Sequence, residues 1–171
     1  MIDDQPKPDY RVGLGTDIHV LVPGRPLMLG GIHIPFPAGL RGHSDGDVAL
    51  HAVIDALLGA SGLGDIGTLF PDKDTAYKNV DSKSLLLNVK DRLEVKRWEI
   101  VNVDLTIHLE QPRLEPFKGQ IRRAIAGLLS MDFACVNVKA KTHEGLDAVG
   151  RGEAIAATAI AMLRIKPKRR L

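Results

Sequence analysis

The chain has 171 residues, of which 44% are hydrophobic and 26% charged, so it can bury a sizeable core in one soluble globular domain. Only 4% are aromatic and the formal net charge is +2, which disfavours a nucleic-acid surface built from stacking and basic side chains. No run of 18 or more apolar residues occurs, which disfavours a membrane-spanning helix. We therefore expect neither a nucleic-acid partner nor a membrane partner.

The single cysteine, Cys135, cannot form an intramolecular disulfide, and its apolar run FACVNV predicts a small core side chain. This cysteine usage suits a reducing compartment, and we expect a cytoplasmic protein. The stretch MIDDQPKPDY lacks the features of a signal peptide, and RIKPKRRL is a basic tail. We predict a single domain over residues 1–171, with flexible ends at 1–9 and 166–171.

The predicted elements start with an alternating strand from Tyr10 to Leu21. LMLGGIHI predicts a second strand, and PFPAGLRG predicts a loop. The period then changes in HSDGDVALHAVIDALLGASGLG, where residues of one face recur about every 3.6 positions. We predict a helix from about Asp45 to Ala60, with Ser44 and Asp47 forming a capping box.

In the second half, DIGTLFPDKDTAYK predicts a loop, after which Asp81 or Ser82 caps a helix that runs to about Lys96. WEIVNVDLTIHLEQ alternates as a long strand, Pro116–Leu129 predicts a helix, and CVNVKAK predicts a further strand. The residues of EAIAATAIAMLRI leave that segment open between helix and strand, since alanine favours a helix. This order of elements predicts a two-layer α/β domain.

The stretch GLGTDIHVL places a carboxylate and an imidazole two residues apart. Asp17 and His19 point to the same face of an extended chain, and His51 lies on the predicted helix, four residues from both Asp47 and Asp55. Two imidazoles and one carboxylate form a zinc ligand set with one position open, and they also suit other divalent metals. The alternative is an exposed helix face, because spacing does not show that the strand and the helix meet.

Other polar residues gather in predicted loops. Lys141, Thr142 and the glycine turns that follow suit phosphate oxygens, and Glu144 could hold a hard cation such as Mg²⁺. Taken alone, each of these segments is more often an ordinary polar turn.

Four segments together resemble the 2-C-methyl-D-erythritol 2,4-cyclodiphosphate synthase family. They are GTDIHVL, HSDGDVALHAVIDALLGASGLGDIGTLFPD, VNVDLTIHLEQPRL and VNVKAKTHEGLDAVGRGEAIAATAIAML, and the resemblance covers roughly residues 10–165. It implies an α+β fold: a two-layer α/β sandwich with a mixed four-stranded sheet, helices on one face, and a chorismate-mutase-like homotrimer with active sites between subunits. It also implies that EAIAATAIAMLRI is a strand.

The resemblance implies zinc ligands at Asp17, His19 and His51, Mg²⁺ or Mn²⁺ at Glu144, and stabilisation of the transition state by His43 and Thr142. The substrate contacts that it implies are Asp17, Ile18, His19, His43, Ser44, Asp65, Ile66, Gly67, Phe70, Pro71, Asp72, Lys73, Asp74, Leu109, Arg113, Lys141, Thr142, His143, Glu144, Ala148 and Arg151.

The implied reaction converts 4-diphosphocytidyl-2-C-methyl-D-erythritol 2-phosphate to 2-C-methyl-D-erythritol 2,4-cyclodiphosphate and CMP. The alternatives are a zinc-dependent phosphohydrolase and a nucleotide-binding trimer without turnover. The chain departs from the family at Ala148, which replaces a phenylalanine lining an axial cavity, and at the neighbouring Asp147. We therefore expect weak binding of prenyl diphosphates in that cavity. We expect the ring of His143 to be solvated.

Overall fold

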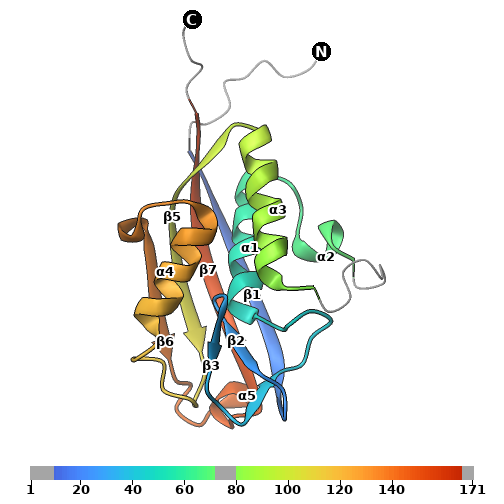
Figure 1. Cartoon of the computed structure of the whole chain (residues 1–171), viewed down its shortest axis with the longest axis vertical. Coiled ribbons are helices and arrows are strands. Elements are labelled where there is room, and N and C mark those ends of the chain that lie inside the picture. The colour runs from blue at the N-terminus through green and yellow to red at the C-terminus, as the bar shows by residue number, and fades with distance from the viewer. Residues whose placement is uncertain (1–9, 72–79, 167–171) are drawn as a thin grey trace, which may run out of the picture.

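The computed structural model describes residues 10–71 and 80–166, which form a five-stranded sheet with helices packed on one of its faces and a separate two-stranded hairpin (Figure 1). In spatial order the strands of the sheet are β4 (Ala38–Leu40), β1 (Tyr10–Pro23), β7 (Ala154–Ile165), β5 (Trp98–His108) and β6 (Val136–Lys141). β5 and β6 are parallel, and the other neighbours are antiparallel. The predicted two-layer α+β architecture with a mixed sheet is therefore confirmed, and EAIAATAIAMLRI is the central strand.

The helices are α1 (Val48–Ser61), α2 (Ile66–Leu69), α3 (Ser82–Val95), α4 (Lys118–Leu129) and α5 (Asp147–Gly150), with a short 3-10 helix, η2 (Phe133–Cys135). In Figure 1, α1, α3 and α4 cover the same face of the sheet. Within the described ranges, no helix has the length and apolar character needed to cross a membrane. Of the ends that we expected to be flexible, residues 1–9 and 167–171 lie outside the described residues, whereas Lys166 donates its N–H to the carbonyl of Arg97.

The prediction of four strands was wrong, because a fifth strand, β4, pairs with the end of β1 through Leu21 and Leu40. β4 lies inside PFPAGLRG, which the sequence marked as a loop. A strand of three residues between a proline-rich turn and a glycine is too short to show alternation.

LMLGGIHI is a hairpin, where one strand was predicted. β2 (Leu27–Leu29) and β3 (Ile32–Ile34) pair with each other and are joined by Gly30 and Gly31, whose φ angles are 62° and 82°. A two-residue turn with both central φ angles positive favours glycine at both positions. The glycine pair therefore marks a chain reversal.

Helix α1 begins later than predicted, at Val48, and its N-cap is Asp47. The buried Asp47 carboxylate accepts the N–H of Leu50 at 3.0 Å and the N–H groups of Gly30 and Gly31 at 2.8 and 2.6 Å. The capping box with Ser44 is therefore not formed. Asp47 instead joins the β2–β3 turn to the start of α1, which fixes the loop that precedes the helix.

Four further predictions met different outcomes. α3 begins at Ser82, and of the two predicted caps, Asp81 and Ser82, it is Asp81 that caps it. α4 starts at Lys118, two residues after the proline that was placed in its first turn, and α2 occupies part of a segment predicted as loop. Cys135 is only partly buried in η2, so its prediction as a core side chain was wrong.

Glycines let α1 lie directly on β1. A Cβ atom at Gly13 would lie 2.0 Å from the carbonyl oxygen of Ala56, and one at Gly15 would lie 2.0 Å from that of Ala52. No side chain fits at either position, so the helix backbone rests against the strand backbone. This close packing carries His51 toward the part of β1 that holds Asp17 and His19.

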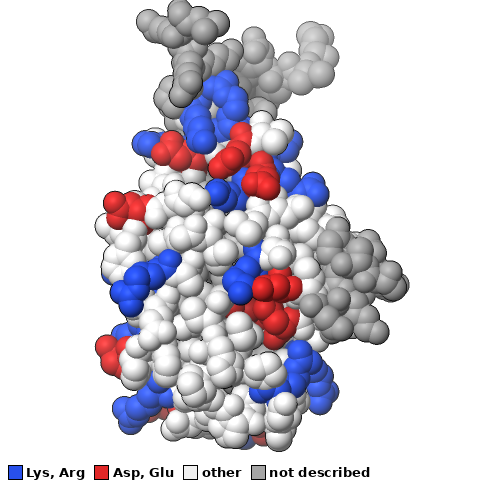
Figure 2. All heavy atoms as spheres, viewed as in Figure 1, with Lys and Arg blue, Asp and Glu red and all other residues white. Residues whose placement is uncertain are grey.

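The two faces of the molecule differ. On the helix face, side chains of both charges are scattered over the surface (Figure 2). On the opposite face, the sheet is uncovered and carries large apolar side chains that are 44–62% exposed: Tyr10, Val12, Leu14, Ile18, Val20 and Ile160. An uncovered apolar face of this kind marks an interaction surface.

Candidate functional site

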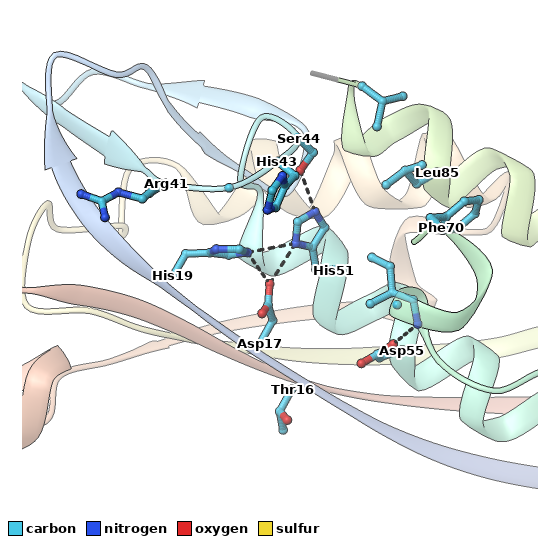
Figure 3. A pocket seen from close by; sticks show the side chains of 14 residues that line it. Thr16, Asp17, His19, Arg41, His43, Ser44, His51, Asp55, Phe70 and Leu85 are labelled. Atoms are coloured by element: carbon cyan, nitrogen blue, oxygen red, sulfur yellow. Dashed lines mark hydrogen bonds and ion pairs between the residues drawn. The ribbon is translucent and has the colours of Figure 1, made fainter. Parts of the chain in front are cut away.

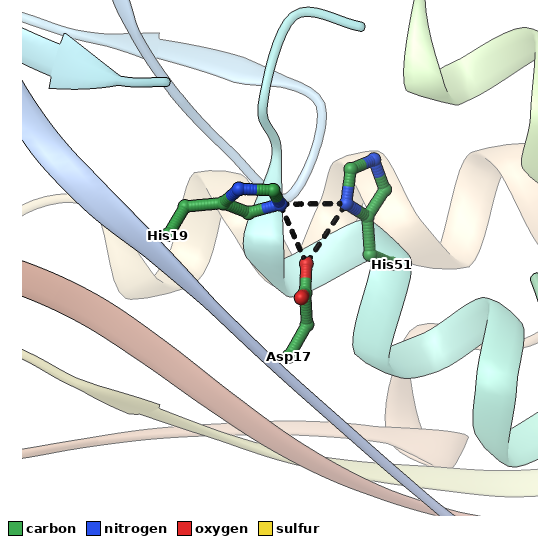
Figure 4. Close-up of side chains that lie close together, drawn as sticks. All are labelled: Asp17, His19 and His51. Atoms are coloured by element: carbon green, nitrogen blue, oxygen red, sulfur yellow. Dashed lines mark hydrogen bonds and ion pairs between the residues drawn. The ribbon is translucent and has the colours of Figure 1, made fainter. Parts of the chain in front are cut away.

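Asp17, His19 and His51 meet at one point (Figure 4). The Oδ2 atom of Asp17 lies 2.9 Å from Nε2 of His19 and 2.9 Å from Nδ1 of His51. The two ring nitrogens are 3.2 Å apart. The period-2 geometry of β1 places Asp17 and His19 on the helix-covered face, and α1 supplies His51.

The three facing atoms fit a divalent metal. Ligand atoms about 2.0–2.1 Å from a tetrahedral zinc ion lie about 3.3–3.4 Å from one another, close to the separations of the triad. A carboxylate oxygen and two imidazole nitrogens are also donors that zinc and related divalent metals accept. With three protein ligands, one position is left open, as in a catalytic rather than a structural site.

Within the triad, Asp17 and His19 shift each other's pKa toward the charged forms. Burial raises the pKa of the Asp17 carboxyl, but hydrogen bonds to His19 and His51 and their charges outweigh it, so this pKa lies well below its usual value. The hydrogen bond with Asp17 raises the pKa of His19, although burial opposes this shift. The carboxylate is therefore held ionised, which is the form that binds a cation.

The triad lies in a pocket of about 520 Å³ (Figure 3). Of the predicted substrate contacts, the pocket is lined by Asp17, His19, His43, Ser44, Ile66, Gly67 and Phe70, with the predicted metal ligand His51. The lining residues that sequence reasoning missed as site residues are Thr16, Arg41, Gly42, Asp55, Val80 and Leu85. Arg41 follows the unrecognised strand β4, and Leu85 lies on α3, so no local pattern marked either as a pocket residue.

The D…H…D face of the helix does not form one cluster. Asp47 caps α1, and Asp55 accepts the N–H of Ile66 at 2.7 Å. Burial raises the pKa of Asp55, and the Ile66 N–H opposes that shift. Among these three helix residues, only His51 therefore joins the triad, while Asp55 holds the start of α2 at the pocket edge.

Some predicted contacts lie elsewhere. Asp65 is exposed and caps α2 by accepting the N–H of Thr68 at 2.7 Å. Ile18 is 57% exposed and lies on the uncovered face of the sheet, between the two triad residues of β1. Pro71 is exposed and is not among the residues that line the pocket. The predicted contacts Asp72, Lys73 and Asp74 lie outside the described residues.

A second hollow lies where β5 and β6 end. It is lined by Leu109, Glu110, Gln111, Pro112, Arg113, Leu114, Glu115, Ala140, Lys141, Thr142 and Glu144. The hydroxyl of Thr142 donates to the carboxylate of Glu144, and the N–H of His143 donates to Oε1 of Glu110 at 2.7 Å. Through this bond, Glu110 connects the segment that follows β5 to the segment that follows β6.

We expected the ring of His143 to be solvated, but both of its nitrogens have partners in the protein. Its Nδ1 lies 2.8 Å from Oδ2 of Asp147, and its Nε2 lies 3.0 Å from Nδ1 of His108. Arg151 pairs with Glu153 through two nitrogens at 3.0 Å, and Ala148 is partly buried in α5. Neither Ala148 nor Arg151 lines either hollow.

The two hollows lie apart within one chain. The triad is on β1 and α1, whereas the second hollow is at β5 and β6, and three strand spacings separate β1 from β6. At about 4.8 Å per spacing, this separation is roughly 14 Å. Predicted catalytic residues His43 and Thr142 therefore do not share a hollow in a single copy.

Known proteins resemble this chain in sequence and in fold. The model of the YgbB family matches residues 10–164. The chain belongs to the YgbB family. A relative of this YgbB chain, the 2-C-methyl-D-erythritol 2,4-cyclodiphosphate synthase of Bordetella petrii, is 53% identical over 154 residues, which are 90% of this chain and 95% of the relative.

Solved structures agree with that membership. The bifunctional IspDF of Campylobacter jejuni matches 96% of this YgbB chain with a TM-score of 0.91 and 39% identity, and the chain spans 45% of that longer protein. The IspF of Plasmodium falciparum in complex with CDP matches with a TM-score of 0.83 and 33% identity, over 95% of this chain and all (100%) of that one.

Proposed function

We propose that this YgbB protein is a 2-C-methyl-D-erythritol 2,4-cyclodiphosphate synthase, a phosphorus-oxygen lyase of the non-mevalonate pathway to isoprenoid precursors. The observation that carries the proposal is the open triad of Asp17, His19 and His51, with ligand atoms 2.9–3.2 Å apart in a pocket. The close identity to a synthase of that name supports it.

The substrate is 4-diphosphocytidyl-2-C-methyl-D-erythritol 2-phosphate. An oxygen of the 2-phosphate forms a bond to the β-phosphorus, the bond from that phosphorus to the bridging oxygen breaks, and CMP leaves with the electron pair. The CDP complex of a structural relative supports a cytidine-linked substrate. No protein nucleophile is needed, because this transfer depends on positioning and charge stabilisation.

Asp17, His19 and His51 would hold one Zn²⁺ per subunit, since their facing atoms suit a tetrahedral ion with one position open. Bound zinc supplies Lewis-acid polarisation of a phosphoryl oxygen. His43 and Ser44, in the loop before α1, line the same pocket and would bind and orient a substrate phosphate. Arg41 also lines the pocket and carries a permanent positive charge.

The second hollow would hold the nucleotide end. Glu144 offers a carboxylate for Mg²⁺ or Mn²⁺ at the diphosphate, and the Thr142 hydroxyl hydrogen-bonds to it. Lys141 lines the hollow and would contact the diphosphate, while Leu109 and Arg113 would contact the cytidine. Several residues that the family resemblance implies as substrate contacts line neither hollow, and we retain them as predicted contacts. They include Ile18, Asp65, His143, Ala148 and Arg151.

We further infer that the active site forms between subunits of a homotrimer. The separation of the two hollows within one chain supports this, since a substrate that bridges them needs a second copy. The exposed apolar side chains on the uncovered sheet face offer the surface for assembly. His43 of one copy would then act beside Thr142 of the next, and we expect the assembly in the cytoplasm.

Phosphorus NMR of the reaction tests this function. With the cytidine-linked substrate, Mg²⁺ and Zn²⁺, we expect signals of CMP and the cyclic diphosphate and no inorganic phosphate, with turnover lost after zinc is removed by a chelator. Release of inorganic phosphate would instead identify a phosphohydrolase. Unchanged substrate signals in the zinc-loaded trimer would identify a binding protein without turnover.

A further inference from the structure

The ring of His51 is held from both sides. Its Nδ1 faces Asp17 and His19, and its Nε2 faces the hydroxyl oxygens of Ser82 at 2.9 Å and Ser44 at 3.2 Å. The residue is 8% exposed. A neutral imidazole carries one proton, so the partner of Nε2 decides whether Nδ1 presents a lone pair or a hydrogen to the triad.

Ser82, the first residue of α3, is fully buried and is bound to Asp45. Its hydroxyl lies 2.5 Å from Oδ1 of Asp45, and its backbone N–H donates to Oδ2 of Asp45 at 3.3 Å. A hydroxyl-to-carboxylate separation of this length is typical of a charge-assisted hydrogen bond. The single hydroxyl hydrogen of Ser82 is therefore directed at Asp45, and the oxygen accepts from Nε2 of His51.

Ser44 is the weaker candidate for this task. Its hydroxyl oxygen lies farther from Nε2 of His51, at 3.2 Å, and it accepts the N–H of Gly46 at 3.2 Å. The Ser44 and Ser82 oxygens are 3.4 Å apart, at the limit of a hydrogen bond. Ser44 therefore shapes the loop before α1, and the shorter bond to His51 belongs to Ser82.

We propose that Ser82, supported by Asp45, is a positioning residue for His51. Two hydrogen bonds in series, from Nε2–H of His51 to Oγ of Ser82 and from the Ser82 hydroxyl to the Asp45 carboxylate, keep the ring proton on Nε2 and turn the lone pair of Nδ1 toward Asp17 and His19. The inference rests on the proposed metal centre. Metal-binding histidines regularly donate the N–H of their second ring nitrogen to a nearby acceptor. Altering that acceptor lowers metal affinity about 10- to 100-fold.

Competitive zinc titration against a chromophoric chelator tests the proposal in the full chain. We expect Ser82→Ala to raise the zinc dissociation constant about 10- to 100-fold and Asp45→Asn to raise it less, because a neutral amide still accepts a hydrogen bond. Ser84→Ala is the matched control, since Ser84 is exposed on the same helix. Wild-type affinity in Ser82→Ala would overturn the role of Ser82. Failure of wild-type protein to bind zinc would overturn the metal centre and, with it, the inference.

A second measurement begins with the wild-type protein and so does not depend on how the variants fold. In zinc-loaded, ¹⁵N-labelled wild-type protein, long-range proton–nitrogen spectra should show His51 with a slowly exchanging proton on Nε2 and no proton on Nδ1. Coordination through Nε2, with the proton on Nδ1, would overturn the proposal. In folded Ser82→Ala, the Nε2 proton should exchange faster, and an unchanged rate would count against the donor chain.

Discussion

At the scale of single residues, the triad works because three side chains from two elements present one atom each to a common point. The same Oδ2 atom of Asp17 contacts both imidazoles, and both rings have a further partner: the Arg41 backbone for His19 and Ser82 for His51. A ring that is held at two points loses little freedom when it binds a metal, which favours an ordered site.

The ligand assignment predicts the behaviour of two variants. Asp17→Asn and His51→Ala should each lower zinc affinity by more than the roughly 10- to 100-fold that follows from altering a partner of a ligand. The fold should persist, because a three-ligand site is not what holds the core together. Metal analysis and circular dichroism measure the two properties, with His33→Ala, an exposed histidine on β3, as the control. Full zinc content in both triad variants would refute the assignment.

Glu144 should act on the other cation. Glu144→Gln removes the negative charge that suits a hard cation, so we expect retained zinc and a higher Mg²⁺ concentration for half-maximal rate. Steady-state rates measured across a Mg²⁺ titration give that concentration, and Glu94→Gln, an exposed residue of α3, is the control. If the Glu144→Gln curve superimposes on that of the wild type, another group holds the cation.

At the scale of elements, the distance between β1 and α1 decides whether the triad forms. Gly13 and Gly15 bring the helix backbone against the strand, which leaves no room for a Cβ atom. The central strand β7 packs small side chains into the same layer, with Ala157, Ala159 and Ala161 all buried. Alanine favours a helix locally, but here the alanines lie in a strand between β1 and β5, where small side chains let α1 pack closely on the sheet.

Gly15→Ala should separate the strand from the helix. A Cβ atom 2.0 Å from the Ala52 carbonyl oxygen forces α1 outward, and overpacking of this kind costs about 1–3 kcal/mol of stability. We also expect weaker zinc binding, because His51 moves with the helix. Gly127→Ala is the control: a Cβ atom at this position of α4 would have nothing within 4 Å, so the substitution should stabilise the protein by about 0.5–1 kcal/mol. Denaturant unfolding measures the stability and zinc titration measures the affinity. Wild-type stability and wild-type zinc affinity in Gly15→Ala would contradict the role of the close packing between β1 and α1.

At the scale of the whole molecule, the uncovered face of the sheet is the main feature that one chain leaves without a partner layer. Its exposed apolar side chains lie on β1 and β7, beside polar groups on β5 and β6 such as the ion pair of Asp104 and Lys139 at 2.6 Å. Protein interfaces commonly have an apolar centre and a polar rim, and this face has the same arrangement.

Leu14→Lys should therefore break the assembly. Leu14 is 62% exposed on the uncovered face, and a lysine there would carry an unpaired charge into the proposed interface. We expect the protein to change from trimer to monomer, with zinc bound but cyclase activity lost. Val95→Lys, at an 84% exposed position at the end of α3, should leave the trimer intact. Light scattering after size-exclusion chromatography measures the mass, and a trimeric Leu14→Lys variant would exclude this face as the interface.

Local patterns in the sequence already determined several features of this protein. The spacing of Asp17 and His19 placed them on one strand face, the period around His51 predicted its helix, and Asp81 before Ser82 marked the start of α3. These features depend on neighbours within a few residues, so the chain carries them without its fold.

Only the tertiary structure decided the rest. Whether His51 meets Asp17 depends on the packing of two backbones at Gly13 and Gly15, and the contact of Ser82 with His51 joins residues 31 positions apart. The short strand β4 exists because β1 offers it hydrogen bonds, and its own three residues have no pattern. Such contacts are set by which surfaces the whole chain buries together, a property that no local segment carries.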